Sequence, residues 1–152
     1  MATSFITMDE VHGFWIGDSL MQVVCWGLVN TIDNSKVPEE EWMKGEFREH
    51  IYNNSQGLFV GFMHLRLGEF LNSPSRKEAF KNCIERTKKF FFDKGEAIPI
   101  EELNDFQLIE ETKAKWILPL EVTRVIKVLN YLEDMVDGKL TIKGSDKIDY
   151  KF

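Results

Sequence analysis

Ser19 is the residue of this 152-residue chain whose neighbours most suggest covalent chemistry, because it stands in the tetrapeptide Gly17 to Leu20 (GDSL). A serine hydroxyl becomes a nucleophile only when a neighbouring base, usually a histidine, accepts its proton. The histidines of the chain are His12, His50 and His64, so none follows residue 64. The sequence therefore offers a candidate nucleophile without an evident base.

The same tetrapeptide resembles the nucleophile block of the GDSL esterases and lipases. In that family the block follows a strand of an α/β sheet, later Gly and Asn residues stabilise the oxyanion, and a DxxH sequence near the C-terminus supplies the base. Here the DxxH sequence, Asp9 to His12, precedes the serine, and Asn104 has no glycine two residues before it. Ser19 has a sufficient structural role as the N-cap of the apolar helix that follows. A serine hydrolase using Ser19 is therefore the least favoured alternative.

The sequence indicates neither a metal site nor a nucleotide site. The histidines are scattered and form no paired ligand set such as HExxH, so we expect no bound metal. Gly57, Gly61 and Gly68 form neither a phosphate-cradling loop with its lysine nor a dinucleotide fingerprint, and we expect them in turns and close contacts. We predict no cofactor and no enzymatic activity.

Charge is distributed unevenly along the chain, which carries 19 Lys+Arg and 25 Asp+Glu for a net charge of -6. Residues 1–57 hold 3 basic and 9 acidic side chains, residues 96–138 hold 4 and 10, and residues 58–95 hold 8 and 4. Such segregation favours an acidic patch that pairs with a cationic protein, the alternative being an ordinary solvated surface. The acidic total argues against binding to nucleic acid.

Composition and length narrow the class of protein further. Hydrophobic residues make up 43% of the chain and aromatic residues 12%, which is too apolar for disorder, and the length suits a single domain over residues 1–152. No basic-then-apolar signal opens the sequence, and the apolar stretch Leu20–Ile32 falls short of the roughly 20 residues that a bilayer requires. We therefore expect a cytoplasmic protein in which Cys25 and Cys83 are reduced core residues.

Hydrophobic periodicity and helix-boundary residues predict a mainly α fold. Helices are expected at residues 20–32, 38–53, 74–94, 106–116 and 119–136, with a short turn or helix at 100–104. Residues 58–67 favour an extended segment, since polar and apolar side chains alternate there, but the length of the segment and its Met and Leu content would also suit a helix. Alternation in residues 139–143 and 147–152, around a Gly-Ser-Asp turn, predicts a hairpin. The expected architecture is a single-domain helical bundle of about five helices with a C-terminal β-hairpin.

Three segments of the middle of the chain carry a family resemblance. They are Gly57 to Leu71 (GLFVGFMHLRLGEFL), the Lys/Arg- and Phe-rich helix that follows, and Gly95 to Asn104 (GEAIPIEELN). Their pattern resembles the small immunity proteins that bacteria encode beside secreted or contact-dependent growth-inhibition toxins. The resemblance implies a non-enzymatic cytoplasmic protein that binds its cognate toxin domain and covers the active site, often through acidic residues when the toxin is a nuclease with a basic cleft.

A toxin-binding surface of this kind needs a charged rim around a few apolar or aromatic anchors. The density of charge places the expected rim at Glu101, Glu102, Asp105, Glu110 and Glu111, with Glu39, Glu40 and Glu41 as the rival patch. Trp42 and Trp116 are the candidate exposed anchors, with a place in the core as the equal alternative for both. The alternative function is an adaptor or regulatory module that binds another protein. In both cases the expected partner is a protein, with no nucleic acid and no membrane involved.

Overall fold

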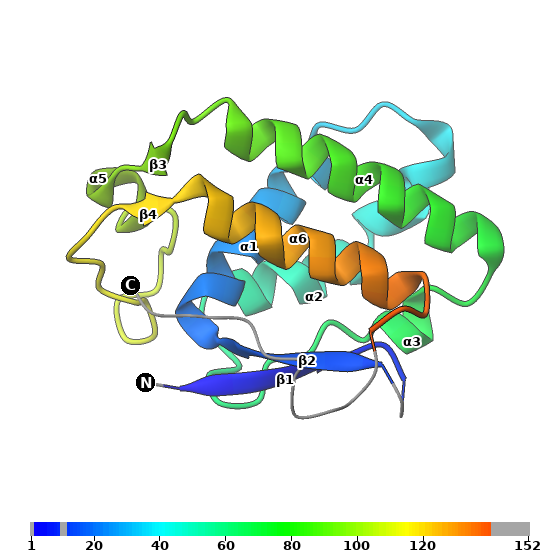
Figure 1. Ribbon diagram of the computed structural model, residues 1–152, viewed down its shortest axis with the longest axis horizontal. Coiled ribbons are helices and arrows are strands. Elements are labelled where there is room, and N and C mark those ends of the chain that lie inside the picture. Colours follow the sequence, from blue (N-terminus) through cyan, green and yellow to red (C-terminus); the bar gives the residue numbers. More distant parts are fainter. Residues whose placement is uncertain (1, 10–11, 141–152) are drawn as a thin grey trace.

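The computed structural model describes residues 2–9 and 12–140, which form a mainly helical single domain (Figure 1). This part of the chain contains seven helices and two small two-stranded sheets. The helices are α1 (Asp18–Asp33), η1 (Pro38–Lys44), α2 (Glu46–Ser55), α3 (Leu67–Phe70), α4 (Pro74–Phe92), α5 (Ile100–Leu103) and α6 (Val122–Val136). The strands are β1 (Thr3–Thr7), β2 (Gly13–Gly17), β3 (Ala97–Ile98) and β4 (Leu120–Glu121).

The most apolar helix, α1, lies at the centre of the domain and contacts α2, α4 and α6. Figure 1 shows α4 and α6 running side by side across it. Apolar residues cover most faces of α1, as expected for a helix surrounded by other elements. Gly27 lets α4 approach closely, because a Cβ at this position would lie 2.3 Å from the buried ring of Phe91. The core therefore forms around α1.

An N-terminal β-hairpin precedes α1 and was not expected from the sequence. β1 and β2 pair antiparallel, with Thr3 opposite Gly17 and Thr7 opposite Gly13. Ile6, Phe14 and Ile16 point into the core, and Trp15 is exposed on the other face. The five-residue strands are too short for alternation to stand out, and β2 runs directly into α1. The two-residue strands β3 and β4 form the second sheet.

Several predicted helices are confirmed, and their boundaries reveal one error. Ser73 caps α4 by accepting a hydrogen bond from the Arg76 N–H at 3.2 Å, and the helix is followed by Gly95 with a φ of +96°. The amphipathic helix predicted from residue 119 begins at Val122. By contrast, α1 begins at Asp18 with Gly17 as its N-cap, so the predicted capping role of Ser19 is wrong.

Two other predictions fail in the loops, and one lies outside the described residues. Residues 106–116 form turns and irregular backbone in place of the predicted helix, because side chains from elsewhere bind the backbone there, as described below. Residues 58–67 begin as turns and contain no strand. The C-terminal hairpin prediction falls largely on residues 141–152, outside the described part. Within that part, no helix combines the length and apolar character needed to cross a membrane.

Candidate protein-binding surface

The GDSL tetrapeptide forms the junction between β2 and α1. The carboxylate of Asp18 is buried and accepts hydrogen bonds from the Ser4 hydroxyl at 2.6 Å and from the Gly61 N–H. Among the described residues, no hydrogen bond joins Ser19 to a histidine, and the His12 ring is bonded to Asp9 in the hairpin turn. The tetrapeptide therefore has a structural explanation as a helix start tied to a neighbouring loop.

The rival acidic patch does not form as expected, because Glu40 is buried with only 1% of its surface exposed. Its Oε1 accepts hydrogen bonds from the Ser35 hydroxyl at 2.9 Å and from the Arg86 guanidinium of α4. Placing Glu40 in an exposed rim is therefore wrong, since its charge is used inside the domain. Glu39 and Glu41, on either side, are exposed.

Trp42 belongs mainly to the packing of the domain. Its ring lies 5.4 Å from that of the buried Phe47, and the Arg76 guanidinium sits over it at 4.5 Å from the centroid. Because both of its ring contacts are internal, the Trp42 ring is poorly placed to act as an anchor for a partner.

The second set of predicted rim residues lies on one exposed segment, residues 100–119, which we call the acidic loop. It comprises α5 and the irregular chain that follows. Four of its five predicted rim carboxylates are exposed, at Glu101, Asp105, Glu110 and Glu111. Glu102 is half-buried and pairs with Lys94. Most of the carboxylates of the acidic loop are therefore exposed at the surface.

The candidate anchor of this loop, Trp116, is buried with 6% of its surface exposed, so it is a core residue and not an exposed anchor, as the alternative expectation had it. Asn104 holds it in place, because the Asn104 side chain accepts from the Trp116 N–H at 2.7 Å and donates to its carbonyl at 2.9 Å. The exposed apolar side chains are instead Leu108 (72%), Ile117 (77%) and Leu118 (51%). Sequence reasoning missed all three, since no pattern distinguished them from core residues.

Buried Gln107 fixes the acidic loop to the helical core. Its side-chain amide donates to Gln22 Oε1 of α1 and to the carbonyl of Ser55 at the end of α2, both at 2.8 Å. Its Oε1 accepts from the N–H of Ala114 at 2.7 Å, which closes the loop on itself. These three bonds satisfy buried polar groups that would otherwise be unpaired.

Gln56, which follows α2, also binds this loop. Its Oε1 accepts from the Leu108 N–H at 2.7 Å, and its Nε2 donates to the Phe106 carbonyl at 3.1 Å. The Thr112 hydroxyl donates to the Gln56 carbonyl at 2.8 Å. A loop ordered in this way before binding loses less conformational entropy when a partner docks.

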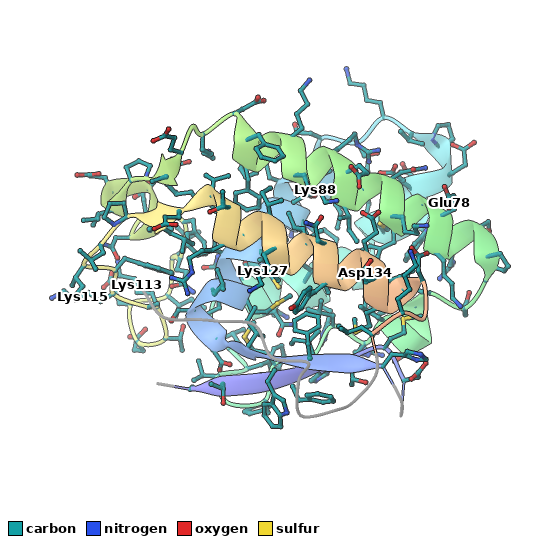
Figure 2. The ribbon with its side chains drawn as sticks, viewed as in Figure 1. Glu78, Lys88, Lys113, Lys115, Lys127 and Asp134 are labelled. Carbon is teal, nitrogen blue, oxygen red and sulfur yellow. The ribbon has the colours of Figure 1, made fainter. Side chains whose placement is uncertain are left out.

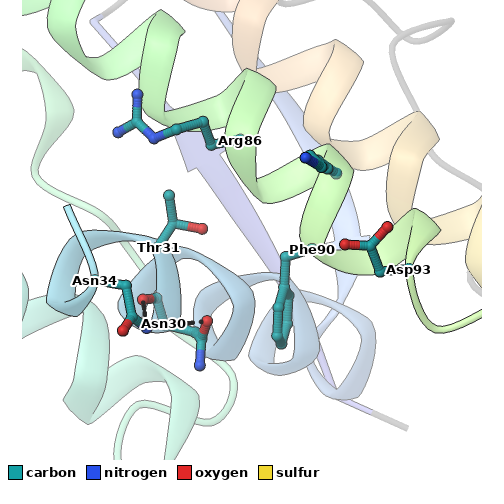
Figure 3. A pocket seen from close by; sticks show the side chains of 7 residues that line it. Asn30, Thr31, Asn34, Arg86, Phe90 and Asp93 are labelled. Atoms are coloured by element: carbon teal, nitrogen blue, oxygen red, sulfur yellow. Dashed lines mark hydrogen bonds between the residues drawn. The ribbon is translucent and has the colours of Figure 1, made fainter.

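The described residues also contain pockets, but their polar groups are largely paired. One of about 300 Å³ lies between α1 and α4, where Asn34 donates to the Asn30 carbonyl at 2.8 Å (Figure 3). Arg86, which also lines this pocket, is paired with Glu40. Another, of about 450 Å³, lies on the acidic loop and is lined in part by Lys113 and Lys115. Figure 2 labels these two lysines, on the left of the view. Lys113 pairs with Glu110 at 3.0 Å. No cluster of three His, Cys, Asp or Glu in the described ranges is arranged to hold a metal ion.

Comparison of the chain with family models, with curated proteins and with solved structures gives no match. A function is therefore proposed from the acidic loop and its surroundings.

Proposed function

We propose that this protein is an immunity-type inhibitor that binds a cationic toxin domain through its acidic loop. The observation that carries the proposal is the composition of this fixed loop, in which Leu108, Ile117 and Leu118 are exposed among carboxylates. Exposed aliphatic side chains on an ordered loop are typical of protein-binding sites. The family resemblance supports the same function, with a nuclease as the favoured class of toxin.

The carboxylates and the aliphatic side chains have different roles in this proposal. A nuclease must bind phosphates, so its cleft is cationic, and an acidic surface is steered toward it. Glu101, Asp105, Glu110 and Glu111 supply that steering and occupy the cleft in place of substrate. Burial of an aliphatic side chain contributes about 1.5–3 kcal/mol, so the three exposed residues supply much of the affinity.

The decisive experiment begins with the gene immediately upstream, which the proposal predicts to encode a product with a C-terminal toxin domain, and measures binding to that domain. Purified wild-type protein is titrated with that domain by calorimetry, and toxin activity is measured with and without it. We expect tight binding and inhibition. The double variant Ile117→Ser/Leu118→Ser should bind at least tenfold more weakly, while Val37→Ser, which alters an exposed apolar residue before η1, should bind like wild type. Unaltered binding by the double variant would contradict the use of this loop.

Charge is tested separately through the rate of association. Glu110→Gln/Glu111→Gln should slow association at low salt and reduce its dependence on ionic strength, because steering acts before contact. An adaptor module is the alternative function, and it would use the same surface for a different protein. If the wild-type protein fails to bind the upstream product, the immunity proposal is wrong.

A further inference from the structure

A second exposed apolar segment lies beside the acidic loop. Residues 56–63, which we call the strap, expose Leu58 (44%), Val60 (46%) and Phe62 (63%), while Met63 is buried. Three large apolar side chains at alternate positions are thus exposed to water on one short segment. Single exposed apolar residues are ordinary, but a set of this kind marks an interaction surface.

Two backbone amides in the second half of the strap bind buried side chains of β1 and α1. The Gly61 N–H donates to the carboxylate of Asp18, and the Met63 N–H donates to the Ser4 hydroxyl at 2.9 Å. Asp18 and Ser4 are themselves buried and bonded to each other. The backbone is therefore fixed on both sides of Phe62, and in this fixed conformation the Phe62 side chain is exposed.

The residue that follows the strap, His64, is held by α2. The His64 carbonyl accepts hydrogen bonds from His50 Nε2 at 2.8 Å and from the Asn54 side chain at 3.0 Å. The Phe59 ring packs between these elements, with its centroid 5.5 Å from that of His50 and 5.8 Å from that of His64. Phe59 therefore supports the strap from beneath and leaves its neighbours exposed.

The N-terminal end of the strap is continuous with the acidic loop. Gly57 has a φ of +84°, and a Cβ on it would lie 2.5 Å from the Thr112 carbonyl oxygen. Together with the Gln56 bonds to Leu108 and Thr112, this close contact makes the two segments adjacent parts of one surface. Leu58 begins the exposed series immediately after this contact.

Charge indicates what the strap would contact. Residues 50–65 contain no Asp, Glu, Lys or Arg, whereas the adjoining acidic loop carries five carboxylates and two lysines and is therefore net acidic. A complementary partner therefore has an apolar area directly beside a basic one. We propose that the strap is the apolar half of a composite interface and receives the apolar border of the same cationic domain that the acidic loop binds. This inference rests on the proposed function.

The test uses the full chain and the upstream toxin domain as the probe. Val60→Ser/Phe62→Ser should bind at least tenfold more weakly than wild type, with an unchanged dependence of affinity on salt, because the removed contacts carry no charge. Val37→Ser is the matched control for loss of an exposed apolar side chain. Because the altered side chains are exposed, we expect equal unfolding midpoints for all variants. Equal midpoints would exclude a folding defect as the cause of weaker binding.

A measurement on the wild-type protein supports the variants independently. Amide hydrogen exchange of residues 58–62 should slow when the toxin domain is added. Binding of Val60→Ser/Phe62→Ser within twofold of wild type, or unchanged exchange at the strap, would overturn the inference. If the acidic-loop variants still lose binding in that case, the proposed function stands; if the wild-type protein does not bind, both proposals fail.

Discussion

Gln56 and Leu108 lie 52 residues apart in the sequence and are joined by a 2.7 Å hydrogen bond from the Leu108 N–H to Gln56 Oε1. The bond holds the backbone of Leu108 against the domain while its side chain remains 72% exposed. It also makes the strap and the acidic loop one structural unit. The candidate interface therefore depends on buried amide side chains as much as on the exposed residues.

Replacement of Gln107 should destabilise the protein and loosen the acidic loop. Gln107→Leu removes three hydrogen bonds and leaves the Ser55 carbonyl, among other buried groups, without its partner. We expect the free energy of unfolding to fall by about 2–4 kcal/mol, measured by urea denaturation. Leu108→Ser, at an exposed neighbouring position, should change it by no more than about 0.5 kcal/mol. Equal effects of the two substitutions would contradict the assignment.

Adjacent glutamates in η1 should differ sharply in their effect on stability. Glu40→Ala leaves the Arg86 guanidinium and the Ser35 hydroxyl without their acceptor, so the free energy of unfolding should fall. We expect a decrease of about 2–3 kcal/mol, less than for a fully buried ion pair, because water reaches Arg86. Glu39→Ala, at an exposed site, should cost no more than about 0.5 kcal/mol. Thermal and urea unfolding of the two variants measure the difference, and a costly Glu39→Ala would argue against this arrangement.

A side chain at position 27 should weaken the contact between α1 and α4. Alanine favours helix more than glycine does, so propensity alone predicts stabilisation of about 1 kcal/mol by Gly27→Ala. The added Cβ would lie 2.3 Å from the Phe91 ring, which is fully buried, so overpacking should dominate and cost about 1–3 kcal/mol. Asn30→Ala, on the exposed side of α1, is the control. A Gly27→Ala protein more stable than wild type would show that Phe91 can move aside.

His50 should make the stability of the protein depend on pH. Burial lowers the pKa of His50 below its ordinary value of 6.5, although the hydrogen bond to the His64 carbonyl opposes the shift. The folded state therefore binds a proton less readily than the unfolded chain, and the free energy of unfolding should decrease as the pH falls from 7.5 to 5.5. His50→Gln can keep a donor for the His64 carbonyl but does not titrate. Urea denaturation at the two pH values should show that the free energy of unfolding decreases less for His50→Gln than for the wild-type protein. An equal decrease in the two proteins would exclude His50 as the cause.

Much of the helical structure was predictable because its signals are local. The amphipathic pattern of α6, the Ser73 cap of α4 and the apolar character of α1 each arise within one segment, and the prediction of a mainly helical fold is confirmed. The error at residues 106–116 has a different origin. That segment contains helix-compatible residues, but side chains of Gln56 and Asn104 bind its backbone in a non-helical arrangement.

The segments in which carboxylates are dense, and the mainly helical character of the domain, can be recognised from the sequence. Which of those carboxylates reach solvent depends on the tertiary structure. Glu39 is exposed and Glu40 is buried because Arg86, 46 residues away, supplies the countercharge inside the fold. Trp116 is buried while Ile117 is exposed, although nothing local distinguishes their roles. Burial depends on contacts between segments that are distant in sequence, and neither composition nor periodicity predicts those contacts.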